Sequence, residues 1–267
     1  MGAELLTLYI VLTFDDLTPD MLTVSDILKS AGVRGTFFIN TAAITSENEE
    51  GIVKELAESH EIGSHSHSHP DLTKLSTEMV YGELELSKQI LERIAKREVK
   101  SFAYPYGAHN NIVVEAVRKC GYTVARTTIV EPPTTTVEDF LRLPVVFHDF
   151  LHLNKEAVEN LLKKLLKEHY TQTTLEHLWR QVAENPVKAL NTLLELLKDW
   201  EPEEDALAII LLHPWKVREL NAWRELEQAV TTAKTIGKIA TLEEAHKTFA
   251  TKPKYIKQTG NREKRLC

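Results

Sequence analysis

Two adjacent carboxylates are the first residues in this sequence that could do chemistry. Asp15 and Asp16 directly follow the apolar stretch Leu5–Phe14. Carboxylates at the end of a buried strand are costly to place unless something binds them. One can ligate a metal ion while its neighbour accepts a proton. Alternatively, either can cap the helix that follows.

A histidine cluster provides a second set of candidate ligands. His65, His67 and His69 stand at alternate positions just after a predicted short strand. On a helical turn His65 and His69 share one face, and on a strand all three do. Imidazoles gathered this closely suit a divalent transition metal. The cluster therefore favours a metal site over three structural histidines.

Two further segments end predicted strands. Residues 102–107 read FAYPYG, where the backbone N–H of Tyr106 could face a bound oxyanion, although proline and glycine equally predict an ordinary turn. His213 follows the apolar run Ala206–Leu212. It is either a buried histidine with a satisfied hydrogen bond or a general acid.

The elements that must position these residues alternate between strand-like and helix-like patterns. Repeated βα units imply a parallel sheet, and ligands bind at the carboxyl ends of its strands, where all four segments lie. After the loop near residue 132, a helical region extends from about 155 to 200. The expected strands are Leu5–Phe14, Gly35–Asn40, Glu61–Ser64, Lys100–Tyr104, Tyr122–Arg126, Leu143–Phe147, Ala206–Leu212 and Lys238–Ala240.

Composition limits the function classes. The 267 residues include 32 basic and 39 acidic side chains, a net charge of −7, which argues against a nucleic-acid partner. No apolar run is long enough to span a membrane. The apolar amino-terminal stretch lacks the basic residues of a signal peptide, so we expect a cytoplasmic protein. We expect one domain over 1–267.

Taken together and in this order, the segments resemble the polysaccharide deacetylase family (the NodB-homology, carbohydrate esterase 4 group). TFDD is similar to its first motif, EIGSHSHSHPDLTKLS to its second, FAYPYG to its third and IILLHP to its fifth. The resemblance covers about residues 8–130 and 204–245. It implies an α/β fold, a distorted incomplete (β/α) barrel, with a helical insertion at about 150–203.

The resemblance also implies roles. Asp16, His65 and His69 would bind a divalent metal, usually zinc, with cobalt, manganese or iron also known in the family. Asp15 would be the general base and His213 the general acid. The backbone N–H of Tyr106 would hold the oxyanion, and Leu211 would line the pocket for the acetyl methyl group. The implied reaction is hydrolysis of a C–N bond, the removal of acetyl from an N-acetylated sugar.

The sequence also departs from the family pattern. Ala103 occupies the position where many members have an arginine that orients the base, so Arg126 or Arg142 would take over that task. The fourth motif is not recognisable, and His148 could reach the site from that region. Two alternatives stay open: hydrolysis of cyclic imides or other non-sugar amides, and a catalytically silent module that binds carbohydrate or metal. The sequence leaves the oligomeric state undetermined.

Overall fold

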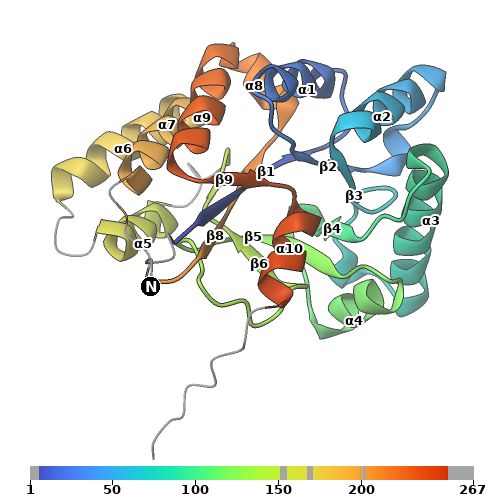
Figure 1. The fold of residues 1–267 in the computed structure, drawn as a ribbon. Coiled ribbons are helices and arrows are strands. Elements are labelled where there is room, and N and C mark those ends of the chain that lie inside the picture. Colours follow the sequence, from blue (N-terminus) through green and yellow to red (C-terminus); the bar gives the residue numbers. More distant parts are fainter. Residues whose placement is uncertain (1–5, 151–154, 167–170, 199, 201–202, 252–267) are drawn as a thin grey trace, which may run out of the picture.

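The computed structural model describes residues 6–150, 155–166, 171–198, 200 and 203–251. Its strands form one sheet in the order β6-β5-β4-β3-β2-β1-β8-β7, with β9 beside β1, and every pairing between named strands is parallel. Helices surround this sheet (Figure 1). The predicted distorted, incomplete (β/α) barrel is confirmed.

The strands are β1 (Leu8–Asp15), β2 (Thr36–Ile39), β3 (Glu61–Ser64), β4 (Ser101–Ala103), β5 (Val124–Val130), β6 (Leu143–Val145), β7 (Phe147–His148), β8 (Ala206–Leu212) and β9 (Lys238–Ala240). The helices are α1 (Asp20–Ser30), α2 (Glu47–Ser59), α3 (Thr77–Ala95), α4 (Asn111–Lys119), α5 (Lys155–Leu166), α6 (Gln172–Glu184), α7 (Pro186–Lys198), α8 (Pro214–Glu219), α9 (Trp223–Ile236) and α10 (Leu242–Ala250). Short 3-10 turns lie at Thr41–Ala43, Leu72–Lys74 and Pro105–Gly107.

Strand periodicity divides the core into two layers. In β1, Ile10 and Leu12 belong to the large cluster between sheet and helices, whereas Val11 belongs to a smaller cluster inside the barrel. Successive side chains of a strand face opposite sides of the sheet. The odd-numbered residues of β1 therefore face the interior, and so does Asp15 at the strand's end.

The segment predicted as one strand at Leu143–Phe147 is two strands, so that prediction is wrong. Leu143 and Val145 of β6 pair with β5, while Phe147 and His148 of β7 pair with β8 at the other edge of the sheet. The chain crosses between the edges at Val146, whose N–H donates to the Ile209 carbonyl at 2.7 Å. This crossing nearly closes the barrel.

The predicted insertion is helical in its described parts. Helices α5, α6 and α7 gather at one side of the barrel beside α9, and α1 to α4 cover the other side (Figure 1). Residues 151–154, 167–170, 199, 201–202 and the basic tail 252–267 lie outside the described residues. The single domain over 1–267 stays a prediction.

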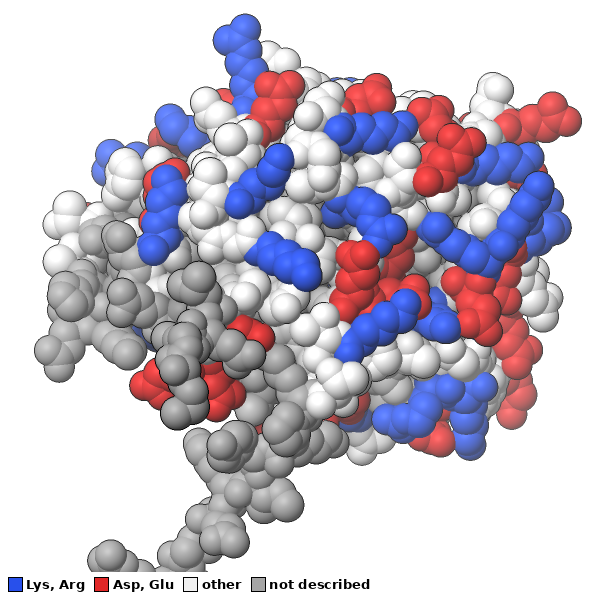
Figure 2. Space-filling view, in the orientation of Figure 1, with Lys and Arg blue, Asp and Glu red and all other residues white. Residues whose placement is uncertain are grey.

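Two further observations concern the charge of the surface and the hydropathy of the helices. Figure 2 shows lysine, arginine, aspartate and glutamate side chains on the same face of the molecule. Among the described helices, none combines the length and the apolar character that crossing a membrane requires.

Candidate active site

The two aspartates at the end of β1 lie in different environments. Asp15 faces the barrel interior and is 2% exposed, and its carboxylate forms an ion pair with the guanidinium of Arg126. Burial by itself raises the pKa of Asp15, but the positive charges around it, led by Arg126, outweigh burial and lower that pKa below its ordinary value. Asp15 is therefore anionic at neutral pH. Asp16 has left the strand, with φ of 66°, and is half-buried.

The histidine loop follows β3 and turns two imidazoles toward one point. Nδ1 of His65 donates to the Ala103 carbonyl at 2.7 Å, which leaves its Nε2 as an acceptor. Nε2 of His69 lies 3.1 Å from Nε2 of His65. Burial lowers the pKa of His65 to about 4, so its ring is neutral at pH 7. His67, which was not among the expected ligands, contacts Thr41 Oγ1 through Nδ1 at 2.9 Å.

Asp16, His65 and His69 form a group of donors that fits a metal ion. One ligand atom from each lies within 4.8 Å of the other two, and Asp16 Oδ1 is 3.8 Å from His69 Nε2. Neutral imidazole nitrogens and a carboxylate oxygen are the ligands that zinc and similar ions bind. The hydrogen bond from His65 Nδ1 to the Ala103 carbonyl also fixes the tautomer of the ring, as is common for metal-bound histidines.

Of the two arginines that the sequence offered as partners for Asp15, Arg126 is the one that lies beside it. It lies on β5 directly opposite Ala103 of β4, and both face the barrel interior. Its guanidinium packs over the Phe38 ring at 5.0 Å, and its Nε and Nη1 are buried with no hydrogen-bond partner among the residues that the structure describes. The small Ala103 side chain leaves room for it. Thus the arginine reaches Asp15 from β5, the strand beside the one that carries Ala103.

The other candidate arginine lies elsewhere. Arg142 forms an ion pair with Asp139 and donates to Asn111 Oδ1 at 2.8 Å, near the surface. These partners belong to the loop before β6 and to the start of α4. Of the two arginines, only Arg126 contacts Asp15.

His213 follows β8 and has a partner that the sequence analysis missed. Asp149, which is completely buried, accepts from the His213 backbone N–H at 2.7 Å and from its Nδ1 at 2.8 Å. Burial opposes the charged ring, but the Asp149 carboxylate outweighs it and raises the pKa of His213. Nε2 of His213 lies 3.9 Å from Asp16 Oδ2. The signal for Asp149 was its place two residues after the predicted strand Leu143–Phe147.

The remaining predicted site residues surround this group. The Tyr106 ring contacts the His69 ring with centroids 4.7 Å apart, and its backbone is left-handed with φ of 59°. Leu211 is buried in the barrel interior, opposite Thr13 of β1. His148 lies opposite Leu211 in β7 and is half-buried. Its Nδ1 accepts from the Phe150 N–H at 3.2 Å.

A glutamate that the sequence analysis did not single out holds the histidine loop. Glu83 of α3 accepts from the backbone N–H groups of His67 and Ser68 at 2.9 and 2.7 Å, and from the Ser68 hydroxyl at 2.6 Å. The loop also has left-handed backbone at Ser66 and His69. Since such backbone is strained for residues other than glycine, Glu83 stabilises a conformation that the loop alone would not keep.

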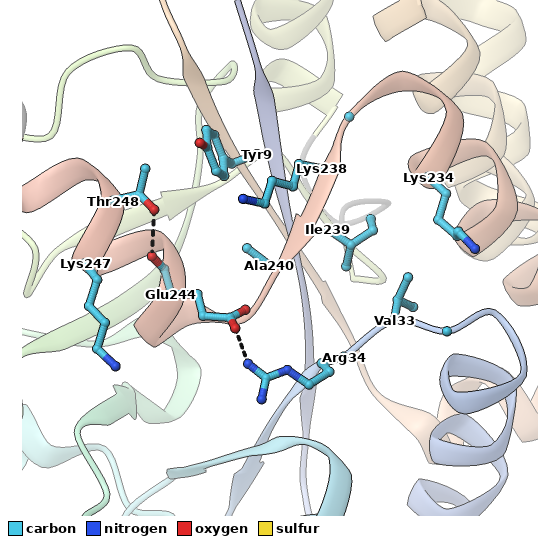
Figure 3. Close-up of a pocket in the computed structure, with 12 residues that line it drawn as sticks. Tyr9, Val33, Arg34, Lys234, Lys238, Ile239, Ala240, Glu244, Lys247 and Thr248 are labelled. Carbon is cyan, nitrogen blue, oxygen red and sulfur yellow. Dashed lines mark hydrogen bonds and ion pairs between the residues drawn. The ribbon is translucent and has the colours of Figure 1, made fainter.

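A hollow of about 610 Å³ lies away from these residues, where β9, α10 and the turn before β2 meet (Figure 3). Arg34 and Glu244 form an ion pair across it, and Lys238 lies over the Tyr9 ring at 5.4 Å. Tyr9 and Lys238 are at the amino-terminal ends of their strands. This hollow is therefore at the opposite end of the barrel from Asp15 and His213.

Part of the chain is similar to a known protein family. Residues 7–125 match the family model for polysaccharide deacetylase. The match spans 119 of the chain's 267 residues. The peptidoglycan-N-acetylglucosamine deacetylase PgdA of Listeria monocytogenes is 39% identical over 115 residues, which are 40% of this chain and 23% of PgdA. The match thus spans less than a quarter of that relative's length.

Solved structures with the deacetylase fold cover most of the chain. The Xyl-CE4 domain of a multidomain xylanase from the hindgut metagenome of Trinervitermes trinervoides has a TM-score of 0.60 at 21% identity, covering 92% of this chain and 93% of that one. The chitin deacetylase of Colletotrichum lindemuthianum has a TM-score of 0.60 at 19% identity, covering 94% and 93%. The shared fold therefore extends beyond residue 125, where the match to the deacetylase family model ends.

Proposed function

We propose that this protein is a metal-dependent hydrolase that removes acetyl from an N-acetylated sugar. The observation that carries the proposal is the arrangement at the carboxyl ends of β1, β3 and β8. There a metal-ligand group, a buried anionic base and a histidine paired with a buried aspartate lie together. The match of residues 7–125 to the polysaccharide deacetylase family model supports the same reaction class.

In the proposed site, Asp16, His65 and His69 would hold a divalent transition metal, most simply zinc. Such an ion supplies a Lewis acid that polarises the acetamide carbonyl and lowers the pKa of water. Asp15 accepts the proton of the attacking water, and Arg126 orients and stabilises that carboxylate. The backbone N–H of Tyr106 donates to the oxyanion that develops as water adds to the carbonyl carbon.

His213 completes the proposed reaction by donating its Nε2 proton to the leaving nitrogen as the C–N bond breaks. The products are acetate and a free amino sugar. Asp149 holds the imidazole by its Nδ1–H, so that the proton to be donated stands on Nε2, and it stabilises the protonated ring. The buried Leu211 would border the acetyl methyl group.

The decisive experiment measures metal content and acetate release together. We expect about one equivalent of zinc, cobalt, manganese or iron after reconstitution, and its loss in Asp16→Ala and His69→Ala. Asp15→Asn should keep the metal and lose at least about 10²-fold in turnover. His213→Ala should likewise keep the metal and lose at least about 10²-fold in turnover. A wild-type protein that binds none of these metals would refute the proposal.

Substrate panels separate the alternatives. Acetate release from N-acetylated sugars supports the proposal, whereas ammonia-free ring opening of cyclic imides would indicate a non-sugar amide hydrolase on the same scaffold. A silent binding module predicts that Asp15→Asn leaves carbohydrate or metal binding intact and that no wild-type turnover exists to lose.

A further inference from the structure

The hollow of about 610 Å³ at the amino-terminal end of the barrel has no part in the proposed deacetylation (Figure 3). It lies between three parts of the chain that are distant in sequence: the turn at residues 32–34, the segment 237–240 that contains β9, and helix α10. Its volume is within the range of sites that bind small ligands. The side chains around it therefore decide which class of ligand it suits.

One side of the hollow is the amino-terminal end of the barrel interior. The Tyr9 side chain packs against the cluster inside the barrel, and its ring meets the Phe249 ring edge-on with centroids 5.5 Å apart. Lys238 is the partner of Tyr9 in the pairing of β1 and β9, so the two side chains lie on the same face of the sheet. The aromatic rings thus close the barrel and leave the Lys238 ammonium at the hollow.

The side chains that line the hollow carry an excess of positive charge. Arg34, Lys234, Lys238 and Lys247 are cationic, and Glu244 is the one carboxylate among the lining residues. This excess contrasts with the net charge of −7 of the whole chain. Positive charges gathered around a recess attract anions and raise their local concentration. The hollow therefore favours an anionic ligand over a neutral or cationic one.

Two of the four cations have a carboxylate partner. Arg34 forms an ion pair with Glu244, and Lys247 pairs with Glu243 of the same helix at 2.9 Å. The side chains of Arg34 and Glu244 are 52% and 45% exposed. Ion pairs this exposed are weak, so either cation can turn to a bound anion at little cost.

The other two cations lack a carboxylate partner among the residues that the structure describes. Lys234 donates to the carbonyl of Ala31, which carries no net charge. The Lys238 ammonium lies 5.4 Å from the centroid of the Tyr9 ring, and Figure 3 shows it between β9 and α10. Two positive charges at the hollow are thus not neutralised by the described part of the protein.

The backbone of β9 adds neutral hydrogen-bond donors. This strand pairs with β1 along one edge, and it has no further partner among the described strands. A strand with one neighbour leaves N–H groups on its other edge unpaired. Because all three residues of β9 line the hollow, these groups lie close to the cationic side chains.

We propose that this hollow binds a small ligand that carries a phosphate group. The two negative charges of a phosphate match the two lysines that lack a carboxylate partner. Its oxygens accept hydrogen bonds from ammonium, guanidinium and backbone N–H donors, all of which border the hollow. The inference does not rest on the proposed deacetylation, because the site is at the opposite end of the strands from Asp15 and His213.

The test measures the binding of inorganic phosphate to the full-length protein by calorimetry, at neutral pH and constant ionic strength. We expect saturable binding by the wild type, and an affinity about tenfold lower in Lys238→Gln, which lacks one charged donor. Lys54→Gln is the matched control. It removes the same charge from a lysine of α2 that pairs with Glu50 and does not line the hollow. Its affinity should stay within about twofold of wild type.

Asp16→Ala separates this hollow from the proposed metal site. It removes a proposed metal ligand, so its phosphate affinity should equal that of wild type. If Asp16→Ala loses phosphate binding while Lys238→Gln keeps it, the anion binds at the metal site and the inference is wrong. None of these measurements requires acetate release, so the inference and the proposed function can fail separately.

Three further results would overturn the inference. One is a wild-type protein that does not bind phosphate. Another is equal phosphate affinity in wild type and a folded Lys238→Gln protein, with folding checked by thermal unfolding. The third is equal weakening in Lys238→Gln and Lys54→Gln, which would indicate general charge attraction. Binding of a glutamate-rich peptide in place of phosphate would assign the hollow to an acidic protein segment instead.

Discussion

At the scale of single residues, environment separates the two neighbouring aspartates. Asp15 ends the inward-facing series of β1 and is paired with Arg126 in the interior. Asp16 is one residue further on, in left-handed backbone, and points its carboxylate toward His69. A one-residue step thus divides the proposed proton acceptor from the proposed metal ligand. The two carboxylates have different neighbours because successive residues at the end of a strand face different directions.

The first prediction concerns the position of the arginine. Arg126→Ala leaves Asp15 buried without its counter-charge, so we expect a loss of about 3–5 kcal/mol in unfolding free energy and at least about 10²-fold in turnover. Ala103 and Arg126 are opposite each other and both face inward. The double variant Ala103→Arg, Arg126→Ala should therefore recover at least about tenfold of the lost turnover.

Arg142→Ala is the control for this pair, since Arg142 contacts Asp139 and Asn111 rather than Asp15. Its turnover should stay within about twofold of wild type. If the double variant folds but its turnover is no higher than that of Arg126→Ala, a guanidinium on β4 cannot replace one on β5. The idea that Arg126 replaces an arginine at position 103 would then be wrong.

The second prediction concerns Asp149. Asp149→Asn removes the carboxylate that receives both His213 N–H groups. An amide can keep one of these bonds but does not stabilise a protonated ring, so kcat should fall at least about 10²-fold. The metal content should not change, because Asp149 is outside the ligand group. Loss of metal in this variant would show that Asp149 acts on the ligands instead.

At the scale of elements, the strands end in strained turns at the site. Asp16, Ser66, His69 and Tyr106 are four of the six residues other than glycine with positive φ in the described chain. Each such conformation costs about 1 kcal/mol or more. Their concentration at the carboxyl ends of β1, β3 and β4 means that neighbouring elements hold these turns in shape.

The third prediction concerns the element that holds the histidine loop. Glu83→Ala removes three hydrogen bonds to residues 67 and 68, which frees the loop that carries His69. We expect metal affinity, measured by competition with a chelator, to fall about 10- to 100-fold. Glu85→Ala, an exposed glutamate of the same helix, is the control. Wild-type metal affinity in a folded Glu83→Ala protein would assign Glu83 a purely structural role.

At the scale of the whole molecule, a buried histidine links three elements at the other end of the barrel. His60, 1% exposed, contacts Ser25 Oγ of α1 through Nε2 at 2.9 Å. It accepts from the Gly35 N–H, just before β2, through Nδ1 at 3.3 Å. A protonated ring could not accept from Gly35. Burial, the main cause, lowers the pKa of His60 to about 4.

The fourth prediction is therefore a loss of stability in acid. Below the unfolded pKa of about 6.5 the unfolded chain binds a proton at His60 that the folded protein does not bind until about pH 4. Unfolding free energy should fall with decreasing pH across this window, by up to about 1.4 kcal/mol per pH unit. Denaturant titrations between pH 7 and 4 measure this slope.

His60→Gln provides the comparison, since its amide can donate to Ser25 and accept from Gly35 without titrating. Its slope should be shallower than that of wild type over the same window. Equal slopes in the two proteins would mean that other groups cause the acid sensitivity and that His60 does not.

The sequence by itself determined which residue types stand at which strand ends. Apolar runs predicted β1 and β8, and Asp15 and His213 were expected at their carboxyl ends. The short spacing of His65 and His69 made them candidate ligands before any fold was known. These features follow from local chemistry, because neighbours within a few residues decide the face and the end of an element.

Only the tertiary structure decided which distant groups meet. Periodicity predicts which face of a strand a residue lies on, but it does not predict the residue's partner. That Arg126 and not Arg142 lies beside Asp15 depends on the register of β4 and β5. The same holds for Asp149 and His213, which are 64 residues apart. The break of one predicted strand into β6 and β7 likewise depended on closing the barrel. Such contacts depend on the packing of the whole chain, which no local pattern contains.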